Sequence, residues 1–252
     1  MLIYSVVIPI LSNVREICIE GEVKMIRMED IHKTYSNGVT ALNGINVHID
    51  QGEFVYIVGP SGAGKSTFIR LMYREEKATN GKITILDQDV SNMKNKEVPY
   101  LRRDIGVVFQ DFKLLPRLTI YENVAFALEV IEASPRRIRN RVMEVLDLVG
   151  LKNKARSIPD ELSGGEQQRV SIARAIANHP KIIIADEPTG NLDPDTSWSI
   201  MRILEEINAR GATVIMATHS KEIVNTIKKR VIAIESGIIV RDEAQGDYGY
   251  EI

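Results

Sequence analysis

FVYIVGPSGAGKST, residues 54–67, is the stretch of sequence that decides the fold. Its first five residues are apolar and rich in β-branched side chains, as is typical of a buried strand. Residues 59–66 then match the pattern G-x-x-x-x-G-K-[S/T]. An apolar helix is predicted directly afterwards, at Phe68–Tyr73. A strand, a glycine-rich loop and a helix in this order predict a phosphate site, because backbone N–H groups and the start of the helix face the anion.

Two side chains of this loop carry specific expectations. Lys65 is expected to bridge the β- and γ-phosphates of a nucleotide, and the Ser66 hydroxyl to ligate Mg²⁺. A glycine-rich turn that matched by chance would not need a strand before it and a helix after it. The remaining candidates for nucleotide contact are Gly59, Pro60, Ser61, Gly62, Ala63, Gly64 and Thr67.

Beyond Met25, short apolar runs alternate with amphipathic stretches, which predicts an α/β fold with a largely parallel sheet. Residues 112–160 contain almost no strand signal, so we expect a helical subdomain inserted into one continuous domain at 25–252. Helix starts are indicated by Thr119 with Glu122, by Ser134 before Pro135 and by Asp193 before Pro194. Further buried strands are predicted at Ile105–Phe109, Lys181–Ala185, Thr213–Ala217 and Arg230–Ile234.

The strand predicted at residues 181–185 ends in two acids, Asp186 and Glu187. Asp186 is expected to hold Mg²⁺, directly or through water, and Glu187 to polarise the attacking water as a catalytic base. Two acids at a strand end are also common on protein surfaces. Their combination with a phosphate loop favours the catalytic interpretation.

A third motif, LSGGEQ, occupies residues 162–167. Ser163 and Glu166 form a capping box, and two glycines expose backbone N–H groups at the start of a helix. By itself this motif is compatible with an ordinary, well-capped helix. The phosphate loop, LSGGEQ and the Asp-Glu strand in this order, however, resemble the ATP-binding-cassette (ABC) ATPases.

The resemblance implies a P-loop NTPase nucleotide-binding domain with a mostly parallel core sheet, an inserted helical subdomain and an antiparallel β portion near the N-terminus. It implies that Tyr35 stacks on adenine, Gln110 touches Mg²⁺ and water, and His219 contacts the γ-phosphate. Without it, Tyr35 and His219 would be taken for surface residues. It also implies a homodimer on ATP binding, in which one set of residues acts on the partner copy's ATP: Ser163, Gly164, Gly165, Glu166 and Gln167.

The sequence DEPTGNLD at residues 186–193 is similar to the branch of ABC ATPases that serves lipoprotein extraction, tripartite export and cell division. Residues 105–130 resemble the cell-division members. This implies an ATPase that pairs with an integral membrane subunit, lies at the cytoplasmic face of the membrane and controls cell-wall hydrolases. The candidates for the partner contact on the helical lobe, with ordinary packing as the alternative, are Asp111, Phe112, Lys113, Leu114, Leu115 and Tyr121.

Two other functions remain open at this point. One is the ATPase subunit of a related lipoprotein-release or tripartite-export system. The other is a soluble, nucleotide-dependent scaffold protein. The single cassette with its short helical insert argues against this second function. Ser220 stands where the family usually has Asp, directly after His219.

The composition of the chain excludes further classes of protein. With 32 Lys and Arg against 34 Asp and Glu, the chain of 252 residues carries a net charge of −2, which argues against a nucleic-acid partner. The single cysteine, Cys18, cannot form an internal disulfide. Residues 1–24 are expected to be either a short genuine extension or the product of too early a start codon, and we favour the second because Met25 and Met28 precede the first motif.

Overall fold

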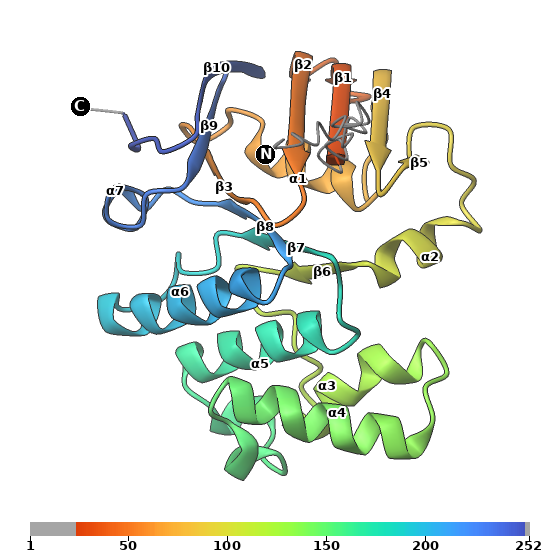
Figure 1. The fold of residues 1–252 in the computed structure, drawn as a ribbon, viewed down its shortest axis with the longest axis vertical. Helices are drawn as coiled ribbons and strands as arrows, with labels where there is room; N and C mark the ends of the chain where they lie inside the picture. The colour runs from red at the N-terminus through yellow and green to blue at the C-terminus, as the bar shows by residue number, and fades with distance from the viewer. Residues whose placement is uncertain (1–23, 250–252) are drawn as a thin grey trace, which may run out of the picture.

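The structure is a computed structural model that describes residues 24–249. Apart from Lys24, the extension expected at residues 1–24 lies outside the described residues. Figure 1 shows the order of the layers: a small sheet, helix α1, a larger sheet, helices α6 and α5, and finally α3 and α4. The larger sheet is therefore covered on both faces.

The larger sheet has six strands in the order β10-β9-β3-β8-β7-β6, and all neighbours are parallel except β10 and β9. The five strands predicted from apolar runs are all present, with ends that differ by one residue at three of them. The strands are β3 (Phe54–Val58), β6 (Ile105–Val108), β7 (Ile182–Asp186), β8 (Thr213–Ala217), β9 (Arg230–Glu235) and β10 (Ile238–Glu243).

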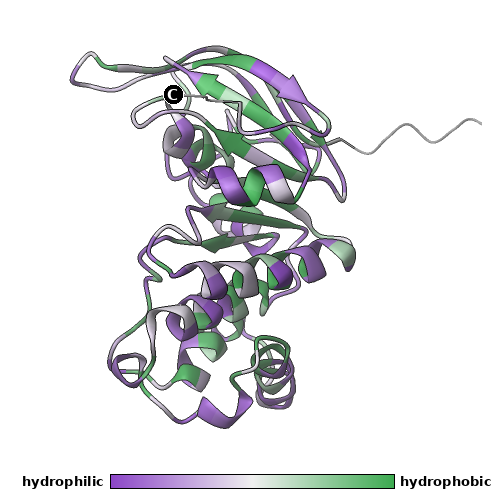
Figure 2. Ribbon diagram, turned by 90° about the vertical axis from the view of Figure 1, so that its left-hand side faces the viewer, coloured by the Kyte–Doolittle hydropathy of each residue, from purple (hydrophilic) through white to green (hydrophobic). Residues whose placement is uncertain are grey.

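Side-chain alternation along β3 explains why these runs are continuously apolar. Phe54, Tyr56 and Val58 belong to the core on the helical side, whereas Val55 and Ile57 belong to the core beneath the small sheet. Both faces of a central parallel strand are buried, so every position must be apolar. The central strands accordingly appear as a hydrophobic layer in Figure 2.

The small sheet is antiparallel, with strand order β2-β1-β4-β5. The family resemblance predicted that such a sheet exists, but its individual strands were not predicted. Its strands mix polar with apolar residues and therefore give no continuous apolar run. Helix α1 begins at Lys65, three residues before the predicted start, and ends at Met72. The elements of this part are β1 (Lys24–Thr34), β2 (Thr40–Asp50), α1 (Lys65–Met72), β4 (Asn80–Ile85), β5 (Gln88–Asp89) and α2 (Val98–Arg103).

The predicted helix starts are confirmed. Thr119 and Ser163 each form a capping box with the glutamate three residues on, and Ser134 and Asp193 cap their helices from the side-chain oxygen. The helices are α3 (Ile120–Glu129), α4 (Pro135–Leu148), α5 (Gly164–Ile176), α6 (Pro194–Ala209) and α7 (Lys221–Thr226), with short 3-10 turns at Lys152–Lys154 and Pro159–Glu161.

Residues 112–160, the helical lobe, hold α3, α4, the first 3-10 turn and the start of the second, and no strand. Val124 and Leu128 of α3 and Val142 and Leu146 of α4 are buried in the same core that covers the helical side of the larger sheet. A continuous apolar core thus joins the lobe to the sheet through α5 and α6.

An ion-pair cluster around Arg230 connects β9 with β10 and with the residue before β3. The guanidinium donates to both oxygens of Asp242 and to Oε2 of Glu53, each at 2.8 Å. Arg230 is only 13% exposed, and the Asp242 carboxylate, aided by Glu53, raises its pKa above the ordinary value. We expect Arg230→Ala to lower the free energy of unfolding by about 2 kcal/mol, because charged hydrogen bonds are lost and two carboxylates stay without their cation.

Urea unfolding measures this loss as a lower midpoint at an unchanged slope. The matched control is Arg210→Ala, which removes a 57% exposed guanidinium that pairs with Glu206 on α6. Screened surface pairs contribute less than about 0.5 kcal/mol. Equal destabilisation by the two substitutions would contradict the role assigned to Arg230.

Candidate active site

One cavity of about 540 Å³ surrounds the glycine-rich loop between β3 and α1. Every residue from Gly59 to Thr67 lines it, so the structure brings together all of the predicted loop contacts. Residues of distant segments complete the lining of the cavity. These are Val39, Thr40, Ala41, Glu187, His219 and Tyr248.

Two glycines give the loop its shape. Gly64, the residue before α1, has φ +109°, and a Cβ there would lie 2.5 Å from the carbonyl oxygen of Ala41. Gly59 has φ +144°, and its Cβ would lie 2.1 Å from the carbonyl oxygen of Ile234. Any other residue would be strained and would clash with backbone at both positions.

Lys65 is buried at the base of this loop. Its Nζ donates to the carbonyl oxygens of Gly59 at 2.8 Å and Pro60 at 3.0 Å. Burial lowers the pKa of Lys65, and the negative charges of Glu187 and Asp186 act against that shift. The ammonium is therefore held inside the loop, at the place where phosphate oxygens would enter.

Tyr35 does not line the cavity but is connected to it. Its hydroxyl lies 3.1 Å from Oγ1 of Thr67, which does line the cavity, and Nζ of Lys33 lies 4.8 Å from the centre of its ring. The tyrosine follows β1 directly and is thereby placed beside the start of α1.

Glu187 and His219, which both line the cavity, meet where β7 and β8 end. The Nδ1 of His219 lies 3.1 Å from Oε2 of Glu187. Glu187 adopts a left-handed backbone with φ +48°, and its N–H donates to the carbonyl oxygen of Ala217 at 3.0 Å. A left-handed conformation costs a non-glycine residue about 1–2 kcal/mol, and such strain gathers at functional sites.

Of the three residues predicted to hold Mg²⁺, Ser66 lines this cavity, whereas Asp186, the last residue of β7, and Gln110 do not. Burial and the neighbouring Glu187 carboxylate raise the pKa of Asp186. A Cβ on Gly190 would lie 3.2 Å from Nε2 of Gln110 and 3.4 Å from Oε2 of Glu187, so the amide and the carboxylate approach the same point. Within residues 24–249 no group of three or more His, Cys, Asp or Glu gathers as a cage. One carboxylate, a hydroxyl and an amide fit Mg²⁺, which takes most of its ligands from phosphates and water.

Residues Ser163 to Gln167 of the LSGGEQ motif do not line this cavity. Glu166 accepts from the Ser163 N–H at 3.0 Å and pairs with Lys154, whose hydrogen bond is the main cause of its lowered pKa. The Gln167 amide donates to the Leu162 carbonyl at 3.1 Å. Both side chains are thus engaged locally, while Ser163 and Gly164 are exposed to solvent at the start of α5.

Several residues near the site were not found from the sequence. Gln168 is fully buried on α5, and its amide donates to the Pro188 carbonyl at 2.8 Å, directly after Glu187. Arg174, also on α5, donates to the carbonyl oxygens of Phe112 and Lys113, at 2.8 and 2.6 Å. Neither belongs to a motif that points to a ligand, so only the folded chain shows these links from α5 to Pro188 and to the helical lobe.

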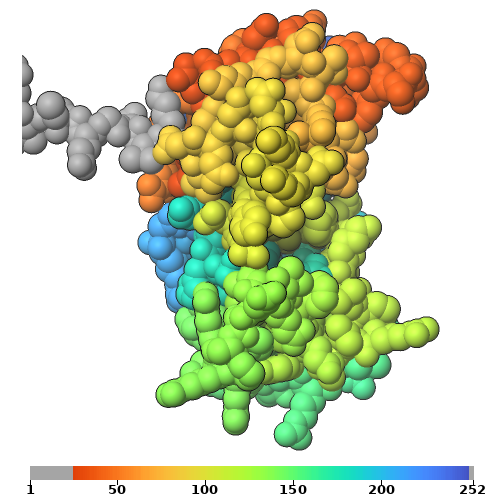
Figure 3. Space-filling view, turned by 90° about the vertical axis from the view of Figure 1, so that its right-hand side faces the viewer, coloured from red at the N-terminus to blue at the C-terminus, as the bar shows by residue number. Residues whose placement is uncertain are grey.

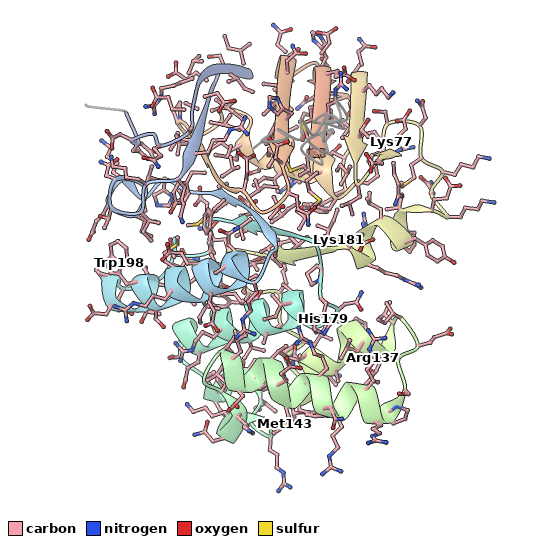
Figure 4. The ribbon with its side chains drawn as sticks, in the orientation of Figure 1. Lys77, Arg137, Met143, His179, Lys181 and Trp198 are labelled. Atoms are coloured by element: carbon pink, nitrogen blue, oxygen red, sulfur yellow. The ribbon has the colours of Figure 1, made fainter. Side chains whose placement is uncertain are left out.

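Ser220, which stands where the family usually has Asp, caps a helix, and the sequence did not indicate this. Its side chain caps α7, accepting from the Ile223 N–H at 3.4 Å, and its own N–H donates to Oγ1 of Thr218 at 3.0 Å. A second cavity of about 250 Å³ lies beside this turn, lined among others by Trp198 of α6, which Figure 4 labels. Ser220 therefore forms the boundary between His219 and α7.

Comparison with known proteins defines the class to which this site belongs. The chain belongs to the ABC transporter family, whose profile matches residues 42–190. Among solved structures it is similar to the ATP-binding cassette MJ0796 in a dimeric post-hydrolysis state bound to ADP and Pi, with a TM-score of 0.79 and 39% identity over 87% of this chain and 98% of that one. The chain is thus an ATPase that binds ATP with Mg²⁺ and has the predicted α/β cassette fold.

The curated relatives identify the branch of the family. The chain is 70% identical over 225 residues to the cell division ATP-binding protein FtsE of Bacillus subtilis (strain 168), covering 89% of this chain and 99% of that protein. It is 47% identical over 213 residues to the protein of the same name from Escherichia coli (strain K12), covering 84% and 96%. The resemblance to the cell-division branch, expected from residues 105–130, is confirmed.

Proposed function

We propose that this chain is the ATPase subunit of an FtsE-type cell-division complex and works with an integral membrane subunit of the FtsX kind. The observation that carries the proposal is the likeness to cell division ATP-binding proteins along nearly their whole length. Among residues 24–249 no helix is long and apolar enough to span a bilayer. A membrane partner would hold the chain at the cytoplasmic face, where ATP hydrolysis would be coupled to the control of cell-wall hydrolases.

We propose the following chemical roles for the residues at and beside the cavity. Glu187 takes a proton from the attacking water, the oxygen of that water bonds to the γ-phosphorus, and the bond to the β-phosphate oxygen breaks, giving ADP and phosphate. Lys65 lies where it would neutralise the phosphates, and His219 lies within reach of both Glu187 and the loop. Ser66, Gln110 and Asp186 would hold Mg²⁺, which when bound neutralises charge on the β- and γ-phosphates.

A single copy does not complete this site. The exposed backbone at Ser163 and Gly164 begins a helix of thirteen residues, but it does not line the cavity of its own chain. A helix start with free N–H groups is an anion-binding element. We therefore infer that two copies sandwich ATP, each presenting residues 163–167 to the phosphate loop of the other.

Next to the residues predicted to contact the partner lies a groove with two apolar side chains that are more exposed than most of those residues. Of the six candidates, Leu114 and Tyr121 pack partly against the core and Leu115 is exposed. Beside them lies a groove of about 440 Å³ between α2 and α3, where Phe126 is 47% and Val130 is 62% exposed. Figure 3 views this side, with α2 in yellow above the lobe in green. We propose that the membrane subunit docks on this groove and on residues 111–115.

Purification of the native complex tests this proposal. We expect the tagged chain to bring down an FtsX-like membrane subunit, identified by mass spectrometry, and Val130→Asp to abolish this because a charge is buried in an apolar contact. Val240→Asp is the matched control, since Val240 is 48% exposed on β10, outside the groove. Recovery of a lipoprotein-releasing or exporter subunit would instead establish the alternative function. Equal recovery with both variants would exclude the groove.

A further inference from the structure

The last described residues form a strap, Gly246–Gly249, that runs back across the segment after α7. The Gly246 N–H donates to the Lys229 carbonyl at 3.1 Å, and Asp247 forms an ion pair with Lys228. The Tyr248 N–H donates to Oδ1 of Asn225, on α7, at 2.8 Å. Residues 246, 247 and 248 are thus attached to residues 229, 228 and 225, so the strap runs antiparallel to the end of α7 and the segment just beyond it.

Arg241, on β10, holds the strap from its other side. Its guanidinium donates to the carbonyl oxygens of Asp247 at 2.7 Å and Tyr248 at 2.8 Å. A Cβ on Gly249 would lie 2.5 Å from this guanidinium, so the strap turns tightly against it at φ +70°. The strap is therefore clamped between the edge strand of the larger sheet and α7.

Tyr248 connects this strap to the cavity that Glu187 and His219 also line. Its side chain is buried in the helical-side core that also contains Ile223 and Val224 of α7, and it lines the phosphate-loop cavity beside Glu187 and His219. Nζ of Lys221, the first residue of α7, lies 5.9 Å from the centre of its ring. One aromatic ring therefore contacts the cavity, the core and the helix that follows His219.

Helix α7 needs such support. It has six residues, and its N-cap, Ser220, directly follows His219. An isolated helix of this length is unstable, because the free-energy cost of nucleating it exceeds the stabilisation from its few hydrogen bonds. Its position, and with it the position of His219, must come from packing. In Figure 1, α7 lies at the left edge of the molecule, away from α3 to α5. It is attached to the core through Ile223 and Val224 and to the strap through Asn225.

We propose that the strap acts through Tyr248 as a positioning element for hydrolysis, holding α7 so that His219 faces the phosphate loop and Glu187. Tyr248 is a positioning residue and not a catalytic one. The inference rests on the role proposed above for His219. It assigns a function to the C-terminal segment, which none of the three nucleotide motifs includes.

ATP turnover of the full chain tests the proposal with two substitutions of the same residue. Tyr248→Ala removes the ring and is expected to lower kcat about 10-fold, since small displacements of a catalytic group cost up to about 100-fold. KM for ATP should change less than about 2-fold, because the phosphate loop is untouched. Tyr248→Phe keeps the ring and should restore most of the rate. Gln245→Ala, an exposed change just before the strap, is the matched control.

A double substitution separates positioning from general damage. In a His219→Ala background, Tyr248→Ala should cost less than about 2-fold more, because residues that act through one another are not additive. A full further 10-fold loss would overturn the proposal, as would normal turnover of the Tyr248→Ala single variant.

Hydrogen exchange distinguishes failure of the strap from failure of the proposed site. Without nucleotide, residues 219–227 should exchange faster in Tyr248→Ala than in Tyr248→Phe. If His219→Ala kept full turnover, the role proposed for His219 would be wrong, and faster exchange would still show that the strap holds α7. Unchanged exchange in Tyr248→Ala would overturn the strap itself.

Discussion

Replacement of Glu187 by Gln should slow ATP hydrolysis by about 10²–10⁴-fold, the usual contribution of a positioned general base. The carboxylate lies at the cavity wall, 3.1 Å from the His219 ring, in a backbone conformation that only the surrounding structure sustains. An amide of the same size cannot accept the proton of the attacking water. ATP binding should persist, since the phosphate loop and Lys65 are unchanged.

The same variant tests assembly. Because bound ATP is no longer consumed, Glu187→Gln should form a stable dimer when ATP is added, measured by sedimentation velocity. The wild-type chain should return to monomer as ATP is consumed. Glu206→Gln, an exposed change on α6, is the control and should hydrolyse ATP normally. Near-normal turnover of Glu187→Gln would remove Glu187 from the role of base.

Replacement of Lys65 by Ala should impair both binding and turnover. Nζ already lies inside the loop, donating to the Gly59 and Pro60 carbonyls, and would contact phosphate before as well as during hydrolysis. We expect ATP affinity to fall about 10- to 100-fold, since a charge-assisted hydrogen bond contributes about 1.5–3 kcal/mol. Turnover at saturating ATP should fall by about 10²–10³, the typical effect of removing one preorganised donor.

Isothermal titration with ATP and a steady-state assay measure the two effects separately. Lys82→Ala removes an exposed lysine of β4 that does not line the cavity, and it should leave both unchanged. If Lys65→Ala lowered turnover while binding ATP with wild-type affinity, the ammonium would act only in the transition state, contrary to this proposal.

The contrast between Glu187→Gln and Lys65→Ala follows from where each group acts. In the proposed mechanism Lys65 would contact charge that ATP carries from the start, whereas Glu187 would act on a proton that moves only during hydrolysis. Loss of uniform binding raises KM, and loss of an interaction specific to the transition state lowers kcat. Measuring both variants in one assay therefore checks the assignment of each.

Much of the fold was predictable because its signals are local. The β3 run and the glycine-rich loop specify a strand, a turn and a helix within fourteen residues, and the caps at Thr119, Ser134 and Asp193 mark helix starts within one turn. The antiparallel sheet escaped strand-by-strand prediction, because half-exposed strands mix polar and apolar residues and obtain their partners from distant segments.

The sequence by itself determined the class of this protein, since the phosphate loop, LSGGEQ and the Asp-Glu strand are contiguous motifs whose chemistry depends on residue order. Only the tertiary structure decided which side chains share the cavity wall. It set His219 against Glu187, joined Gln168 to Pro188 and placed Tyr248 beside both the loop and α7. Such contacts join residues that are far apart in the chain. They form only because the cores on the two faces of the larger sheet hold the strand ends and the strap next to each other.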